Sequence, residues 1–181
     1  MTSRPSTDVR FRAIYDAHYG AVRNYCLRRL PPAEVGDAMA EVFVIVWRRM
    51  ADAPASDEVL PWIYGVARHV LANQRRGTRR GLRLVAKIGA QPVESDPGPE
   101  PVVVRRETDR VMLAALDQLR PEEQELLRLR AWEQLSSANI GEVLGISADA
   151  VDMRLARARR KLERLVTDAS INSRFEAGGE Q

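Results

Sequence analysis

Residues 135–155 read LSSANIGEVLGISADAVDMRL, and this stretch decides the fold of the C-terminal half. Its apolar residues recur at helical spacing on both sides of Gly145, which is typical of two short helices joined by a tight turn. Ser136 and Ser147 precede the two helices, where a hydroxyl can accept a hydrogen bond from a free backbone amide. Gly141 is small at the point where the two helices would approach most closely. The pattern predicts a helix-turn-helix.

The outward side of the second of these helices would enter the major groove of duplex DNA. Arginines further along the same helix would meet the phosphate backbone. We therefore expect duplex-DNA contacts from Ser147, Asp149, Asp152, Met153, Arg154 and Arg157. Glycine-centred turns also occur in plain helical bundles, and this alternative interpretation leaves the stretch without a ligand.

A proline-rich segment divides the chain. Residues 91–101 read QPVESDPGPEP, with four prolines and only acidic charges, and proline denies a helix its amide donors. Apolar residues at helical spacing fill both flanking halves. The sequence predicts an all-α protein of two small helical domains: an N-terminal domain over 1–90, a linker over 91–107, a C-terminal helix-turn-helix domain over 108–170 and a flexible tail over 171–181. An ordered surface loop within one domain is the alternative interpretation of the proline-rich segment.

The last helix predicted in the N-terminal half has two different faces. Leu60, Ile63, Tyr64, Ala67, Val70, Leu71 and Gln74 fall on one side at 100° per residue. The opposite side carries an arginine stripe, which consists of Arg68, Arg75, Arg76, Arg79, Arg80 and Arg83, with Trp62 and Asn73 at its border. No acidic residue occurs between Glu58 and Ala90, so these charges repel one another without compensation. We expect a phosphate-bearing partner to supply the counter-charge.

Composition excludes several classes of site. The chain has 181 residues, one cysteine (Cys26) and two histidines, so neither an internal disulfide nor a cysteine-based zinc cluster can form. We expect no metal, no cofactor and no catalytic residues. The longest apolar run, 42–47, is too short to span a bilayer. The first residues lack the apolar stretch of a signal peptide, so we expect no membrane insertion and a cytoplasmic protein.

Three segments, in this order, resemble the bacterial RNA polymerase sigma factors of the extracytoplasmic-function group, in the sigma-70 family. Residues 37–43 (DAMAEVF), followed by Trp47, resemble the segment that grips the polymerase clamp. Residues 61–68 (PWIYGVAR), running on to 73–76 (NQRR), resemble the helix that opens and holds the −10 promoter element. Residues 119–123 (LRPEE) and the predicted helix-turn-helix resemble the domain that reads the −35 element.

The resemblance implies roles for individual residues and partners. Core RNA polymerase and promoter DNA are the implied partners, and members of the group are often held inactive by an anti-sigma factor. The linker would thread through the polymerase, and the loop at 51–56 and Asn73 would read a base turned out of the duplex. The implied polymerase contacts are Asp37, Glu41, Phe43 and Trp47. The implied −10 contacts are Trp62, Arg68, Asn73, Arg75, Arg76, Arg79 and Arg80.

Two positions, Trp62 and Asp152, leave alternatives open, and Ala40 departs from the pattern of the group. Trp62 either stacks on an unpaired base or is a half-buried core residue. Ala40 stands where the group usually has glutamine, which removes a polar contact to the polymerase. Asp152 stands where a basic residue is common. Because a carboxylate repels phosphate but can accept a hydrogen bond from the amino group of cytosine, it predicts either an atypical −35 preference or weaker duplex binding.

Two other functions compete with a sigma factor. A helix-turn-helix regulator that does not act as a sigma subunit would leave the arginine stripe and the clamp-like segment idle. A small hydrolase would need a nucleophile and an orienting carboxylate beside His18 or His69. His69 lies beside the arginine stripe, where no such residue is a helix neighbour, so we do not expect an enzyme.

Overall fold

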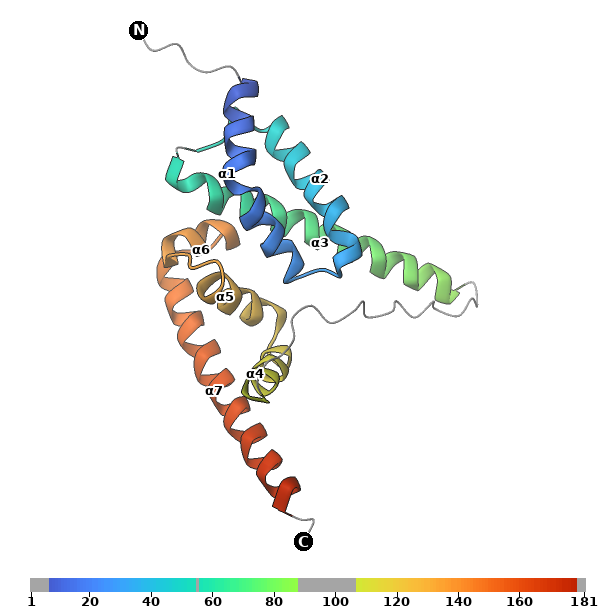
Figure 1. Cartoon of the computed structure of the whole chain (residues 1–181), viewed down its shortest axis with the longest axis vertical. Helices are drawn as coiled ribbons and strands as arrows, with labels where there is room; N and C mark the ends of the chain where they lie inside the picture. Colours follow the sequence, from blue (N-terminus) through green and yellow to red (C-terminus); the bar gives the residue numbers. More distant parts are fainter. Residues whose placement is uncertain (1–6, 55, 88–106, 179–181) are drawn as a thin grey trace. The chain divides into compact units, whose positions relative to one another are not determined.

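The computed structural model of the chain describes residues 7–54, 56–87 and 107–178, with the side chains of 7–54, 57–77 and 110–169. Every regular element within these residues is helical, which confirms the predicted all-α fold (Figure 1). The chain divides into two compact units, Met1–Pro99 and Glu100–Gln181. The predicted linker lies outside the described residues except for Glu107, which begins a helix.

The N-terminal unit is a three-helix arrangement in which each helix packs against the other two. Its described elements are α1 (Thr7–Leu27), α2 (Pro32–Arg48), the short 3-10 helix η1 (Ser56–Glu58) and α3 (Val59–Lys87). Proline opens α2 at its first position, where the missing amide donor costs nothing. In α3, Pro61 falls within the first turn for the same reason.

The core of this unit forms where the apolar stripes of the three helices meet. Val22 and Tyr25 of α1, Val46 of α2 and Ile63 of α3 are fully buried. The rings of Tyr25 and Tyr64 stack with their centroids 5.0 Å apart, which joins α1 to α3. The predicted inward face of α3 is therefore confirmed for Ile63, Tyr64, Ala67, Val70 and Leu71, which are buried, whereas Leu60 and Gln74 at its two ends are half-buried.

In the C-terminal unit, three shorter helices pack against one long one. The elements are α4 (Glu107–Asp117), α5 (Pro121–Ala131), α6 (Ser137–Leu144) and α7 (Ala148–Gly178). Leu129, Ile140 and Val151 are fully buried, one from each of α5, α6 and α7. The predicted flexible tail begins inside α7, because no proline or glycine interrupts the sequence from Ala148 until Gly178.

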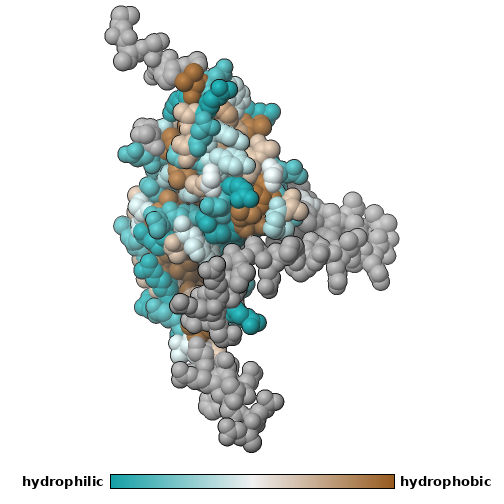
Figure 2. Space-filling view, viewed as in Figure 1, coloured by the Kyte–Doolittle hydropathy of each residue, from teal (hydrophilic) through white to brown (hydrophobic). Residues whose placement is uncertain are grey.

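The surface carries both hydrophilic and hydrophobic residues (Figure 2). The face drawn in Figure 2 carries mostly hydrophilic residues with separate small apolar patches. Among the described residues, no helix has the length and apolar character that crossing a membrane requires.

Candidate nucleic-acid interface

The helix-turn-helix is built by the capping residues that the sequence pattern indicated. Ser136 Oγ accepts a hydrogen bond from the Asn139 amide at 3.1 Å, at the start of α6. Gly145 ends α6 in the left-handed conformation, with φ 69° and ψ 39°. Ser147 Oγ accepts from the Ala150 amide at 3.2 Å, at the start of α7. Each of these local predictions is confirmed.

Gly141 lies at the closest contact between α6 and the turn. A Cβ atom at this position would come within 2.6 Å of the Ile146 carbonyl oxygen, which belongs to the backbone and cannot rotate away. The Ile146 amide donates to the Gly141 carbonyl at 3.0 Å. The turn therefore closes directly over Gly141, and this confirms the predicted close approach.

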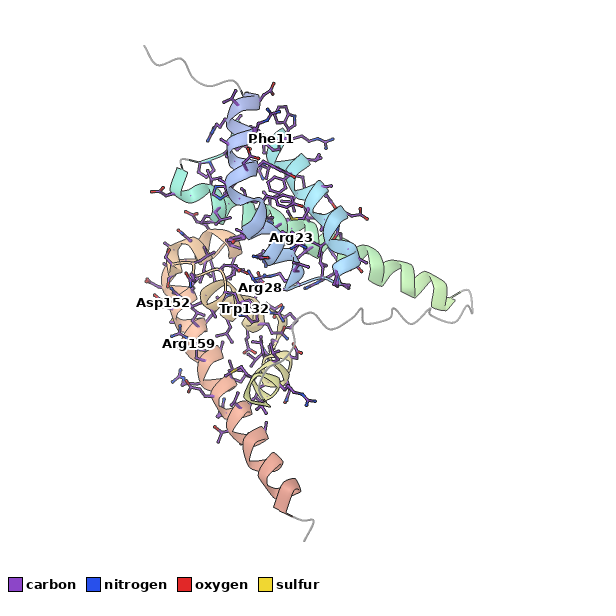
Figure 3. All side chains as sticks on the ribbon, viewed as in Figure 1. Phe11, Arg23, Arg28, Trp132, Asp152 and Arg159 are labelled. Carbon is purple, nitrogen blue, oxygen red and sulfur yellow. The ribbon has the colours of Figure 1, made fainter. Side chains whose placement is uncertain are left out.

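The predicted duplex-reading residues lie on the exposed side of α7 or, in the case of Ser147, directly before it. Ser147, Asp149, Asp152, Met153, Arg154 and Arg157 are all exposed. Met153 leaves 57% of its surface exposed, which is unusual for so apolar a side chain. Figure 3 places Asp152 near the α6 end of α7 and Arg159 further along the same helix. Polar, charged and apolar side chains thus share a face that can meet base edges and phosphates.

Asp152 is already engaged within the domain. Its Oδ1 atom accepts a hydrogen bond from Ser137 Oγ at 2.5 Å. The same hydroxyl accepts from an Arg130 guanidinium nitrogen, also at 2.5 Å, and this nitrogen lies 3.9 Å from Asp152 Oδ1. No local sequence pattern indicates this chain of contacts, because its members come from three different helices.

A second polar contact joins α7 to the start of α5. Lys161 of α7 donates to Glu123 of α5 at 2.8 Å, and the Arg120 amide donates to the same carboxylate at 2.9 Å. These hydrogen bonds, that from Lys161 first, hold the pKa of Glu123 below its usual value. The pair fixes α7 against the first turn of α5.

In the N-terminal unit, the described part of the arginine stripe is partly engaged with its own helices. Arg75 donates to the Arg29 carbonyl at 3.0 Å, and Arg76 donates to the Asn73 side chain at 2.5 Å. Arg75, Arg76 and Asn73 nevertheless stay exposed, and Arg68 is half-buried. The side chains of Arg79, Arg80 and Arg83 lie outside the described residues.

Trp62 has the partial burial that one of its two predicted environments requires. It is half-buried, and the Arg49 guanidinium carbon lies 5.9 Å from its ring centroid. A ring that is partly packed and partly open can present one edge to an unpaired base.

The predicted polymerase-binding residues of α2 separate into two groups. Asp37 and Glu41 are exposed, and Trp47 leaves 42% of its surface exposed. Phe43 is buried, and its ring lies 4.6 Å from that of Tyr15 and 6.2 Å from that of Tyr19. Phe43 therefore packs under the partly exposed rings of Tyr15 and Tyr19 and does not present its own ring to a partner.

Sequence reasoning missed Arg10, which holds the loop after α2. Its guanidinium donates to the carbonyls of Ala53 at 2.8 Å, Pro54 at 2.9 Å and Met50 at 3.4 Å. The contacts join residues 40 or more positions apart, so no local pattern could have revealed them. Arg10 thus fixes part of the loop to which the resemblance assigns base reading.

The described residues contain no group of three or more histidine, cysteine, aspartate or glutamate side chains that could hold a metal ion. Cys26 is fully buried in the core of the N-terminal unit, and this burial raises the pKa of its thiol to about 11. Burial lowers the pKa of His18. Both groups are therefore in environments that favour their neutral forms.

Two helical units, one with a helix-turn-helix and one with an arginine-rich helix, define a DNA-binding protein that can contact a nucleic acid at two places. Residues 14–81 match the family Sigma-70 region 2, and residues 109–162 match Sigma-70, region 4. Together these matches span more than half of the chain.

Two RNA polymerase sigma factors align with this chain over nearly its whole length. The chain is 26% identical to RNA polymerase sigma factor YlaC of Bacillus subtilis, over 90% of this chain and 95% of that protein. It is 28% identical to ECF RNA polymerase sigma factor SigL of Mycobacterium tuberculosis, over 88% of this chain and 90% of SigL. The chain belongs to the sigma-70 family of RNA polymerase sigma factors, in the extracytoplasmic-function group.

A solved structure shares the fold. The sigma factor RpoE, in complex with the anti-sigma factor NepR from Bartonella quintana, superimposes with a TM-score of 0.65 at 16% identity. The match covers 87% of this chain and 96% of that one.

Proposed function

We propose that this chain binds core RNA polymerase and directs promoter-specific initiation by reading −35 duplex DNA and holding the opened −10 strand. The observation that carries the proposal is the presence, in one chain, of the region 2 and region 4 sequences on two separate helical units. A regulator that acts through its helix-turn-helix alone would not explain why residues 14–81 match Sigma-70 region 2.

The C-terminal unit supplies the −35 contacts in this proposal. The exposed face of α7 would enter the major groove, with Ser147, Asp149, Met153 and Arg154 near base edges and Arg157 near phosphates. Exposed Met153 would contact apolar base surface such as the methyl group of thymine.

The N-terminal unit would supply the −10 and polymerase contacts. Arg68, Arg75, Arg76, Arg79 and Arg80 would follow the phosphates of the opened strand, with Trp62 and Asn73 near an unpaired base. On α2, exposed Asp37, Glu41 and Trp47 would meet the polymerase, with Phe43 holding the surface from beneath.

The remaining parts of the proposal concern organisation and partners. Residues 1–90 and 108–170 would act as the two binding domains, joined by a linker over 91–107, with 171–181 as a tail. A complex with an anti-sigma factor, such as the one that RpoE forms with NepR, is a further proposed interaction. The chain would act in the cytoplasm and would itself catalyse no reaction, because the polymerase carries out the chemistry.

Charge removal on the arginine stripe tests this assignment. Arg75→Gln together with Arg76→Gln should reduce run-off transcription and promoter opening more than capture of core polymerase. The salt dependence of binding to opened DNA should become shallower by roughly 0.7 in the logarithmic slope for each phosphate that is no longer neutralised.

Arg23→Gln is the control, because it removes an exposed guanidinium from α1 and leaves the stripe on α3 unchanged. It should leave promoter opening at the wild-type level. Equal losses of polymerase capture and promoter opening in the Arg75/Arg76 variant would refute the assigned role.

A further inference from the structure

We propose that Asp152 is a positioning residue, which fixes the DNA-recognition helix α7 against α5 and α6 and does not read a base. The inference rests on the proposed function, since it assumes that α7 contacts the −35 duplex. It concerns a residue whose sequence position alone suggested contact with cytosine or repulsion of phosphate.

Two hydrogen bonds that share the Ser137 hydroxyl connect residues of three helices. Arg130 is in the last turn of α5, Ser137 is the first residue of α6, and Asp152 is the fifth residue of α7. The Ser137 hydroxyl accepts from Arg130 and donates to Asp152 Oδ1, so one oxygen atom joins all three elements. Few side chains could replace it, because the position needs a group that both donates and accepts.

The charge of Asp152 is balanced from within the domain. Its carboxylate lies 3.9 Å from the Arg130 guanidinium, whose side chain is only 31% exposed, whereas the carboxylate is 65% exposed. A nearby positive charge lowers the cost of a carboxylate that faces the phosphate backbone. The structure therefore explains why an acidic residue is tolerated on a helix that meets DNA.

The position of Asp152 on α7 links its contact with Ser137 to DNA recognition. Asp149, Met153 and Arg154 lie within one turn of Asp152 on α7, so a rotation or shift of that turn moves every candidate base-reading side chain together. Removal of the contact should weaken binding to all −35 sequences alike, because the whole reading face is displaced. A base-reading residue would instead alter the preference at one base pair.

The main comparison that tests the inference is between wild type, Ser137→Ala, Asp152→Ala and the double variant, each as the full chain bound to core polymerase. The probe is a library of DNA duplexes randomised over the −35 element, and sequencing of bound duplexes gives both affinity and base preference. Thermal unfolding verifies that each variant is folded at the assay temperature.

We expect each single variant to lose roughly three- to tenfold in affinity for all selected duplexes, the net effect of one ordinary hydrogen bond at an exposed site. The double variant should be no weaker than either single variant, because both remove the same contact. Ser137→Thr should restore affinity, since it keeps the hydroxyl. Asp168→Ala, which removes an exposed carboxylate further along α7, should bind as wild type does.

Several results would overturn the inference. These are a change of preference at a single base pair in Asp152→Ala only, additive losses in the double variant, or wild-type affinity in Ser137→Ala. If Asp152→Ala does not fold, Asp152→Asn retains an acceptor for Ser137 and should keep the wild-type base preferences. Failure of the wild-type complex to select any duplex would instead refute the proposed function.

Discussion

Two glycines of the helix-turn-helix are required for different physical reasons. Gly145 adopts φ 69°, a backbone conformation in which a side chain is strained. Gly141 has ordinary helical geometry, but a Cβ atom there would meet the Ile146 carbonyl oxygen at 2.6 Å. The first requirement is conformational and the second is steric, and together they fix the angle at which α7 leaves the turn.

Gly141→Ala should therefore destabilise the C-terminal unit, although alanine is the better helix former. We expect a loss of about 1–3 kcal/mol in the free energy of unfolding, because the added methyl group must displace backbone atoms. Gly20→Ala is the control, since a Cβ atom at Gly20 meets nothing within 4 Å. It should stabilise α1 by about 0.5–1 kcal/mol. Urea unfolding measures both, and a stable Gly141→Ala variant would contradict the steric argument.

Cys26 illustrates how burial controls the reactivity of a residue. The reactive form of cysteine is the thiolate, and burial raises the pKa of Cys26 to about 11 even though the Arg29 charge opposes this shift. At pH 8 the native chain should therefore resist an aromatic disulfide reagent, and it should release one equivalent of the coloured thiol only after unfolding in guanidinium chloride. Fast reaction of the native chain would show that the thiol is accessible.

At the scale of elements, the sequence predicts those structural features that are decided by residues close together along the chain. The serine caps, the left-handed glycine and the inward face of α3 were all predictable, because each is decided within a few positions along the chain. The contacts of Asp152 with Ser137 and of Arg10 with the loop after α2 were not predictable, because their partners lie 15 and at least 40 positions away along the chain. Phe43 shows the same limit: its motif suggests a contact, but only tertiary packing reveals that Tyr15 and Tyr19 cover its ring.

The contact between α5 and α7 through Glu123 and Lys161 should make stability depend on pH. The folded-state pKa of Glu123 is lowered, so its contribution is fully present above the pKa of an unfolded glutamate and is lost as pH falls through the folded-state pKa. Glu123→Gln should thus be less stable than wild type at neutral pH, by about 1 kcal/mol or less, since both side chains retain contact with water. The difference should shrink as pH falls below about 4.

Urea unfolding at a series of pH values measures this difference. Glu122→Gln serves as the control at the exposed neighbouring position, and its difference from wild type should not change with pH in the same way. A pH-independent difference for Glu123→Gln would mean that Lys161 does not stabilise the charged carboxylate.

At the scale of the whole molecule, the buried apolar side chains of the described residues form two hydrophobic cores, one in each unit. Val22, Val46 and Ile63 are fully buried in the N-terminal unit, and Ile140 and Val151 are fully buried in the C-terminal unit. Each unit is of the size at which a single core can support cooperative folding. A protein that contacts DNA at two separate sites benefits from this division, because each unit can settle on its own site.

Calorimetry of the full chain should therefore resolve two unfolding transitions that respond separately to mutation. Ile63→Val removes one buried methyl group from the N-terminal core, and Ile140→Val removes one from the C-terminal core, at a cost of about 0.5–1.5 kcal/mol each. For units of this size, about 1 kcal/mol lowers the transition temperature by roughly 4–8 °C. Each variant should move one transition and leave the other in place, and the double variant should show both shifts unchanged. If either variant moved both transitions together, the two cores would be thermodynamically coupled, and the units could not adjust independently to the two DNA sites.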